Sequence, residues 1–341
     1  MAGMGWNVIG HTWAADLLRQ HIAGGNLRHA YLFSGPTGVG RRTLALRFAQ
    51  AVNCTQPPAP GDACGKCQTC RQIERMQHTD LTVVQAEETG TVLKVKQIRE
   101  LQHMLSLSPY TGGYRIALLL RFEEANANAQ NALLKTLEEP NPKVLLLLTA
   151  NDPENLLPTI TSRCELMRLR PMAVDDLAAA LEVQENLSKD KALLIAHISG
   201  GRAGFAKRMA CDGEMLEKRK QWMVDMLALL TAGRTERFHY SEKTTRIGKK
   251  DRGEAKSVLL EGMANWLSFW RDVLLVGTES GTQITNIDLQ ESVHRTAEAV
   301  NLRDAAHAVS ALEHAFKRIQ TANLQLMLDT ILLDWPFVNA G

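Results

Sequence analysis

The sequence lacks a dominant charge, a membrane-spanning run and a secretory leader. Its 341 residues carry a formal net charge of +2, so the overall charge does not indicate a nucleic-acid or membrane partner. No apolar stretch reaches the length of about 20 residues that is needed to cross a bilayer. The first eleven residues hold no basic segment followed by an apolar one, which argues against secretion. We therefore expect a cytoplasmic protein.

What the chain does contain is typical of a globular protein of two or three domains. Apolar residues make up 45% and charged residues 22%, and there is no internal repeat or long low-complexity tract. Six cysteines are present, and four of them lie between residues 54 and 70. In a reducing compartment such a cluster favours a metal site over disulfide bonds.

The segment at residues 35–43 has the spacing of a phosphate-binding loop. Such loops follow the pattern G-x-x-x-x-G-K-[ST] between a strand and a helix. Gly35 and Gly40 match it, residues 30–33 are a plausible buried strand, and residues 43–53 have the apolar pattern of a helix. An ordinary tight turn of an α/β protein is the alternative.

The two positions that would handle phosphate and metal are changed in this loop. Arg41 stands where a lysine would reach the phosphates, and Arg42 where a hydroxyl would hold Mg²⁺. A guanidinium can pair with phosphate but cannot coordinate a metal. Moving the register so that Thr43 supplies the hydroxyl places Pro36 and Arg41 at the glycine positions. We expect a degenerate, silent phosphate loop of Gly35, Gly38, Gly40, Arg41, Arg42 and Thr43.

Apolar runs alternate with helical patterns up to residue 171 and predict an α/β fold. Strands are expected at residues 30–33, 81–84, 116–120, 144–149 and 165–169, and helices at 6–23, 43–53, 95–105 and 129–137. Trp13 is expected on the apolar face of the first helix. This alternation predicts a parallel sheet covered by helices on both faces.

Beyond residue 171 the pattern predicts helices alone. They are expected at residues 174–182, 190–198, 222–230, 258–276, 305–319 and 324–335. The basic, polar stretch 243–256 is expected to be an exposed loop or the start of a helix. Trp266 and Trp270 lie four residues apart, which predicts core or interface packing rather than a cofactor site.

The four clustered cysteines have the spacing C-x9-C-x2-C-x2-C. They are Cys54, Cys64, Cys67 and Cys70. Four thiolates suit tetrahedral Zn²⁺, and a closed shell of four sulfurs leaves no open position for a substrate. The sequence therefore predicts structural zinc, with free or redox-active thiols as the alternative. The isolated Cys164 and Cys211 are expected to be packed thiols.

The acidic residues of a loop-type ATPase are also displaced. In such enzymes a later strand ends in carboxylates that hold Mg²⁺ and polarise water. Here the strand at residues 116–120 is followed by Arg121, and Glu123 and Glu124 come one turn too late. We expect these glutamates at a solvated helix start, where negative charge is favourable. Two separate losses indicate that hydrolysis is not the task of this chain.

Three further segments carry a resemblance to a known family. They are residues 131–140 (NALLKTLEEP), the tripeptide Ser162-Arg163-Cys164, and residues 29–36 (HAYLFSGP) joined to the four-cysteine insert. With them the chain resembles the AAA+ clamp-loader subunits of bacterial DNA polymerase III. The resemblance implies an AAA+ domain at 1–171 with the zinc insert at 54–70, a helical lid at 172–211 and a helical collar for oligomerisation at 212–341.

The resemblance also implies roles for single residues. In the family the arginine of the Ser-Arg-Cys segment reaches the ATP of a neighbouring subunit. Arg163 is thus expected to act as a finger in trans, and such fingers contribute about 10³–10⁵ in rate. The family's ATPase subunit, gamma/tau, keeps the Lys-Thr of the loop and an Asp-Glu pair where this chain has Leu120 and Arg121.

The nucleotide sensors of the family are represented only in part. The lid position of the sensing arginine is Gly204 here, and Arg202 is out of register. Asn151 lies near the first sensor position and could still face nucleotide.

We therefore hypothesise a stator within the polymerase (nucleotidyltransferase) holoenzyme. It does not hydrolyse ATP, lends Arg163 to a neighbouring ATPase, and helps to open the sliding clamp and place it on primed DNA. The partners implied by the resemblance are the gamma/tau and delta subunits, the clamp and primer–template DNA, without a membrane. Zinc is the expected structural cofactor, and ATP binding is left open.

Three alternatives compete with this hypothesis. A weak ATPase of the gamma/tau type would use Arg41 in place of lysine and Glu123 or its neighbour in place of the lost acids. A DNA-binding zinc insert would use Lys66 and Arg71, although no aromatic platform accompanies them. A purely structural subunit would keep the assembly role without the Arg163 finger.

Overall fold

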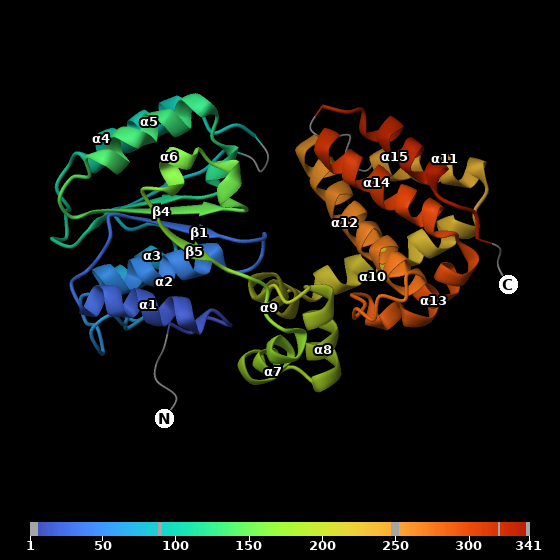
Figure 1. Cartoon of the computed structure of the whole chain (residues 1–341), viewed down its shortest axis with the longest axis horizontal. Coiled ribbons are helices and arrows are strands. Elements are labelled where there is room, and N and C mark those ends of the chain that lie inside the picture. Colours follow the sequence, from blue (N-terminus) through green and yellow to red (C-terminus); the bar gives the residue numbers. More distant parts are fainter. Residues whose placement is uncertain (1–5, 88–90, 247–251, 320, 339–341) are drawn as a thin grey trace. The chain divides into compact units, whose positions relative to one another are not determined.

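The computed structural model describes residues 6–87, 91–246, 252–319 and 321–338. The chain divides into two compact units (Figure 1). The first comprises Met1–Ala180 with Gly201–Ala206, and the second Leu181–Gly200 with Lys207–Gly341. The expected lid, 172–211, is therefore shared between the two units, and the division into three domains stays a prediction.

The first unit is built on one parallel sheet of five strands. These are β1 (Ala30–Ser34), β2 (Leu81–Val84), β3 (Arg115–Leu119), β4 (Val144–Ala150) and β5 (Glu165–Arg168), in the order β2-β3-β4-β1-β5. Each of the neighbouring pairs is parallel. All residues of β1, β3 and β4 are buried, which explains why these strands are mostly apolar, with Ser34, Arg115 and Thr149 as the polar exceptions. The five expected strands are confirmed.

Helices cover both faces of this sheet, as expected (Figure 1). One face carries α1 (Thr12–Ala23), α2 (Arg41–Asn53) and α3 (Gln68–Glu74), and the other α4 (Val95–Leu105), α5 (Ala127–Glu138) and α6 (Pro158–Thr161). Successive residues of β1 point to opposite faces. Phe33 therefore packs in the core under α1 and α2, and Leu32 in the core under α4 and α5.

The first helix differs from its prediction. The helix expected within residues 6–23, after an opening turn, begins at Thr12 and is preceded by His11 in a left-handed conformation with φ of 53°. Its buried residues include Ala14 and Leu18, whereas Trp13 is 51% exposed. Placing Trp13 on the buried face was wrong. The position of a residue around the helix axis decides its burial, and position 13 lies outside the buried face although tryptophan is large and apolar.

Residues after β5 form helices throughout the described part of the chain. They are α7 (Val174–Gln184), α8 (Lys189–Ile198), α9 (Ala203–Cys211), α10 (Gly213–Thr231), α11 (Arg234–Arg246), α12 (Arg252–Gly277), α13 (Gln290–Ala299), α14 (Leu302–Arg318) and α15 (Leu324–Asp334). The expectation of a loop or helix start at 243–256 was wrong at its beginning, where Lys243 to Arg246 end α11. The middle of that stretch, 247–251, lies outside the described residues. None of the helices that the structure describes is long and apolar enough to cross a membrane.

The core of the second unit is rich in tryptophan. Trp266 and Trp270 are completely buried, as expected from their spacing. Their ring centroids lie 5.0 Å and 6.0 Å from that of Trp335, in edge-on contacts that stabilise aromatic cores.

Candidate functional site

The loop after β1 has the backbone of a phosphate-binding loop. Its three glycines, Gly35, Gly38 and Gly40, have φ values of 144°, 87° and 115°, which side-chain-bearing residues rarely adopt. The loop lies where β1 separates β4 from β5, and the amide of Gly35 donates to the carbonyl oxygen of Ala150 at 3.2 Å. Ligands of open α/β sheets bind at such points beyond the carboxyl ends of the strands.

Two arginines follow the glycines of the loop, and a guanidinium cannot coordinate a metal. Arg41 is the first residue of α2 and is only 8% exposed, and Nη1 has no hydrogen-bond partner among the described residues. Burial lowers the pKa of Arg41, and the nearby Glu123 carboxylate opposes this effect. Arg42 and Thr43 are exposed. The predicted loop residues thus lie together, and their lack of nucleotide activity stays a prediction.

A cation occupies the strand end where an ATPase keeps acids. Leu120 is buried, and Arg121 adopts a left-handed conformation with φ of 49°. The Nε of Arg121 donates to both carboxylate oxygens of Glu124 at 3.0 Å. The side chain of Glu124 is only 12% exposed, so the expectation of a solvated helix start was wrong for this residue. The ion pair with Arg121 covers the carboxylate of Glu124 and shields it from solvent.

Two polar residues connect the loop to the neighbouring strand end. The hydroxyl of Thr37 donates to Asn151 Oδ1 at 3.0 Å, and the backbone amide of Asn151 donates to Glu123 Oε1 at 3.2 Å. Asn151 therefore lies beside the loop, as its expected sensor position requires. A sensing role stays a prediction.

The start of α9 packs on the loop, which the sequence did not indicate. The amide of Phe205 donates to the carbonyl oxygen of Gly38 at 2.9 Å. A Cβ at Gly204 would lie 2.9 Å from that oxygen, so close packing here needs glycine. Nη1 of Arg202 lies 3.5 Å from the carbonyl oxygen of Thr37. At Gly204, the lid position where the resemblance implies a sensing arginine, the loop and α9 are thus in close backbone contact.

The four clustered cysteines converge on one centre. The sulfur atoms of Cys54, Cys64, Cys67 and Cys70 all lie within 4.8 Å of one another, and those of Cys64 and Cys70 are 3.9 Å apart. Zn–S bonds of about 2.3 Å in a tetrahedron place sulfurs about 3.8 Å apart, so these thiols fit a metal ion. The cluster is close enough to hold a metal.

Backbone amides favour the thiolate form of two of these cysteines. The amide of Cys67 donates to the sulfur of Cys64 at 3.2 Å and lowers its pKa. Burial raises the pKa of Cys67, but bonds from the Cys70 amide and from Thr55 outweigh it and bring the pKa to about 6. Burial raises the pKa values of Cys54 and Cys70. Metal binding displaces the remaining thiol protons.

The insert is fastened to the helices beneath it. The indole of Trp6 donates to the carbonyl oxygen of Gly61 at 3.1 Å, and Arg19 pairs with Asp62 at 2.8 Å. Gln50 of α2 donates to the carbonyl oxygen of Cys70 at 2.7 Å. The four-cysteine insert is thus held against the face of the sheet that carries α1 and α2.

The two isolated cysteines differ. Cys164 packs against the core under α4 and α5, and burial raises its pKa to about 12. Cys211 is exposed, and its sulfur lies 3.6 Å from a carboxylate oxygen of Glu185. The expectation of a packed thiol was therefore wrong for Cys211, which is the last residue of α9 and is exposed.

Arg163 lies at the surface between α6 and β5. Its side chain is 36% exposed, Nη1 donates to the carbonyl oxygen of Thr159 at 2.9 Å, and Nη2 pairs with Glu138 at 2.8 Å. Among the described residues, its side-chain partners are thus Glu138 and Thr159, and neither belongs to the loop after β1. The finger role itself stays a prediction.

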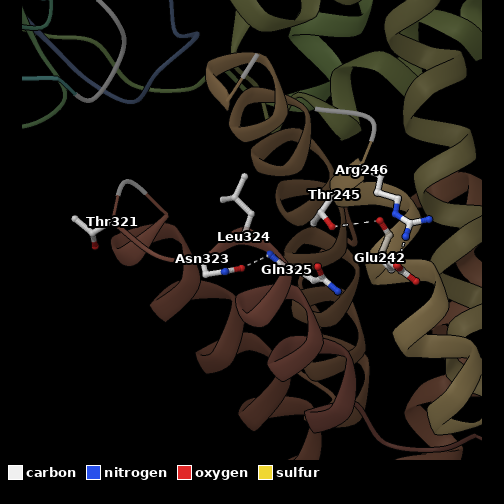
Figure 2. A pocket seen from close by; sticks show the side chains of 7 residues that line it. All are labelled: Glu242, Thr245, Arg246, Thr321, Asn323, Leu324 and Gln325. Carbon is white, nitrogen blue, oxygen red and sulfur yellow. Dashed lines mark hydrogen bonds and ion pairs between the residues drawn. The ribbon is translucent and has the colours of Figure 1, made fainter. Parts of the chain in front are cut away.

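A pocket of about 530 Å³ opens in the second unit, between the end of α11 and the start of α15 (Figure 2). It is lined by Glu242, Thr245, Arg246, Thr321, Asn323, Leu324 and Gln325. Glu242 and Arg246 pair at 2.5 Å, and Asn323 accepts a bond from the amide of Gln325 at 3.0 Å. These bonds join polar groups of the pocket lining to one another.

Sequence comparisons relate the chain to one replication family. Residues 10–173 match the family described as DNA polymerase III, delta subunit, and residues 254–336 match its C-terminal family. DNA polymerase III subunit delta' of Pseudomonas aeruginosa is 35% identical over 225 residues, which cover 64% of this chain and 67% of the relative. Subunit delta' of Bacillus subtilis is 27% identical over 93% of both chains.

Similarities over a smaller part of the relative, or at lower identity, extend to tau and gamma-related proteins. DNA polymerase III subunit tau of Escherichia coli is 34% identical over 52% of this chain, but that match covers only 27% of tau. A solved structure of a DNA polymerase III gamma subunit-related protein from Thermotoga maritima superimposes with a TM-score of 0.48 and 16% identity. It covers 94% of this chain and 97% of that chain.

Proposed function

Because the chain belongs to the DNA polymerase III delta subunit family, it is a clamp-loader subunit of that polymerase, and we propose that it works there as a non-hydrolysing stator. In this role it supplies Arg163 to the ATP bound by a neighbouring subunit. One contrast carries the proposal. Arg163 is partly exposed at the surface, whereas Arg121 stands at the end of β3, where an ATPase would have an acidic residue.

The groups around the loop support the absence of hydrolysis. Phosphoryl transfer needs Mg²⁺ held by a hydroxyl and a carboxylate, and a base or water-positioning residue. Arg41 and Arg42 replace the residues that would act in the loop, and Arg121 neutralises Glu124. Three arginines near one loop can attract an anion but cannot hold its metal.

The surroundings of Arg163 support the trans role. The neighbouring Cys164 is anchored in the core, and Arg163 itself remains partly exposed at a turn. A guanidinium on a rigid base can stabilise the charge that develops on a transferred phosphoryl group. The proposed partners are the gamma/tau and delta subunits, the sliding clamp and primed DNA, and the proposed compartment is the cytoplasm.

We also propose that the four-cysteine cluster holds structural zinc. Each chain should bind about one zinc ion through four thiolates. Replacing a ligand, in Cys67→Ser, should release the metal and lower the stability of the first unit. Replacing the exposed thiol outside the cluster, in Cys211→Ser, should leave the metal content unchanged. Elemental analysis of the purified variants measures both, and equal zinc in all three proteins would contradict the zinc proposal.

ATP hydrolysis in a reconstituted loader tests the stator proposal. The mixture contains gamma/tau, delta, the clamp and primed DNA, with either the native chain or Arg163→Ala. The variant should lower turnover at the site it serves by about 10³–10⁵-fold. The chain alone should give background turnover only.

Size-exclusion chromatography of both loaders provides the assembly control. Native ATP turnover by an assembled Arg163→Ala loader would contradict the finger and favour the alternative of a purely structural subunit. Turnover by the chain alone, abolished by Arg41→Ala, would favour the weak ATPase.

A further inference from the structure

Two segments that are 25 residues apart in sequence meet at Arg163. The last residue of α5, Glu138, pairs with Nη2 of Arg163 through its Oε1 at 2.8 Å. From the other side, the carbonyl oxygen of Thr159 in α6 accepts a bond from Nη1 at 2.9 Å. The guanidinium is therefore held at two points by two different helices.

The placement of Glu138 is unfavourable for the helix that carries it. A carboxylate in the last turn of a helix opposes the helix dipole, which favours cations there. Helix α5 ends at Glu138, ahead of Pro140, which cannot continue it. The last turn of α5 carries one basic residue, Lys135, and Arg163 adds a second cation that pairs directly with Glu138 and compensates for its charge.

The backbone beneath Arg163 is also fixed. Its amide donates to the carbonyl oxygen of Ile160 at 3.1 Å, and the amide of Cys164 donates to the carbonyl oxygen of Thr161 at 3.4 Å. Ile160 is completely buried, and Cys164 packs in the same core. Because the backbone is fixed, the direction of the guanidinium depends on the side-chain conformation of Arg163, which the contacts with Glu138 and Thr159 restrict.

We propose that Glu138 is a positioning residue for Arg163 in the trans reaction. This inference rests on the proposed function of Arg163. A guanidinium has five N–H donors, and the two contacts use one on each of two nitrogens. Three donors remain for the phosphate oxygens of the neighbour, so Arg163 can act without leaving Glu138. An arginine that is already oriented loses less side-chain freedom when it engages the phosphate.

The next residue offers a matched control. Glu139 carries the same charge, is exposed, and forms no ion pair that is found within the described residues. Removing either carboxylate changes the net charge of the chain equally. Only Glu138→Ala removes a contact to Arg163.

ATP turnover by the reconstituted loader tests the proposal. Because exposed ion pairs are weak, Glu138→Ala should lower kcat about two- to fivefold. The KM for ATP should stay unchanged, since the interaction acts in the transition state. Glu138→Gln keeps an oxygen acceptor at the same reach and should lie between the native chain and Glu138→Ala. Glu139→Ala should match the native chain.

A double variant separates positioning from a structural role. In an Arg163→Ala chain, adding Glu138→Ala should change turnover no further. Native turnover, or a gain, in Glu138→Ala would overturn the positioning proposal, as would a further loss in the double variant. If an assembled Arg163→Ala loader turns over ATP at the native rate, the proposed finger fails. If Arg163→Ala is slow but Glu138→Ala turns over ATP at the native rate, the finger stands and only the positioning role of Glu138 fails.

Discussion

The loop after β1 and the turn before β5 both carry arginine, but their surroundings differ. Arg41 at the loop is 8% exposed and lies near a second arginine and a glutamate. The side chain of Arg163 at the turn is 36% exposed and held by one carboxylate and one carbonyl oxygen. The charge of Arg41 is thus buried within its own unit, whereas that of Arg163 stays partly exposed. Under the proposed function, this difference favours Arg163 as the arginine that acts on a neighbouring subunit.

The comparison also explains how one side of an ATP site can be lost while the other is kept. The loop has lost the groups that hold Mg²⁺, because Arg42 and Arg121 occupy their positions. The turn needs no metal, since a finger acts through charge and hydrogen bonds alone. A chain that only completes its neighbour's site needs to retain only the second region.

The same substitution in both regions should give the largest difference. Arg163→Lys keeps a positive charge but loses the planar fork that can bind two oxygens at once. We expect the reconstituted loader to lose about 10–100-fold in turnover at the site served. Arg41→Lys, which restores the residue of an active loop, should leave loader turnover within about twofold because the acidic pair is still missing. Equal losses for both variants would break the comparison.

A smaller effect tests whether backbone contacts fix the loop. Gly38→Ala introduces a Cβ that would lie 2.9 Å from Cβ of Phe205, at a φ of 87°. Strain and overpacking should reduce the free energy of unfolding by about 2–4 kcal/mol.

Gly25 provides the control for that variant, since it has a φ of 68° with no atom within 4 Å of its added Cβ. Gly25→Ala should cost only the conformational strain of about 1–2 kcal/mol. Urea denaturation of the purified chains measures both changes. Equal costs would show that α9 does not pack on the loop.

The smallest expected effect is a pH dependence at the loop. Nε2 of His11 donates to the carbonyl oxygen of Val39 at 3.1 Å, and burial lowers the pKa of His11 below its usual 6.5. The folded chain therefore binds this proton less readily than the unfolded chain. The resulting stability is present above pH 6.5 and is lost as the pH falls below that value.

His11→Gln isolates this contribution, because glutamine can donate a hydrogen bond but does not titrate. Between pH 7.5 and pH 5.5, about one unit on either side of the usual histidine pKa, the native chain should lose more stability than His11→Gln. Urea midpoints across this range provide the measurement. Parallel pH profiles of the two proteins would exclude a role for His11.

The sheet and its covering helices were predictable because buried parallel strands leave an unmistakable pattern. Residues 144–149 form a continuous apolar run, and β4 extends only one residue further. Helix α11 was not predicted, since Arg234 to Arg246 are largely polar and lack an apolar period. This helix is held instead by Arg237, whose guanidinium donates to the carbonyl oxygens of Leu229, Leu332 and Trp335. Such distant partners leave no local signal.

The candidate sites show the same limit. The four cysteines were predictable from spacing alone, because short C-x2-C turns bring sulfurs together. The contacts of Arg163 with Glu138, and of Gly38 with Phe205, join residues that are far apart in the chain. The sequence identified both motifs that meet in the contact between Arg163 and Glu138, but only the fold shows that they touch.

ATP turnover by three loaders compares the two regions most directly. One contains the native chain, one Arg163→Ala, and one the double loop variant Arg41→Ala, Arg42→Ala, each with gamma/tau, delta, clamp and primed DNA. The account predicts that the double loop variant hydrolyses ATP like the native loader and that Arg163→Ala is strongly impaired. Impairment of the double loop variant with native turnover by Arg163→Ala would contradict it.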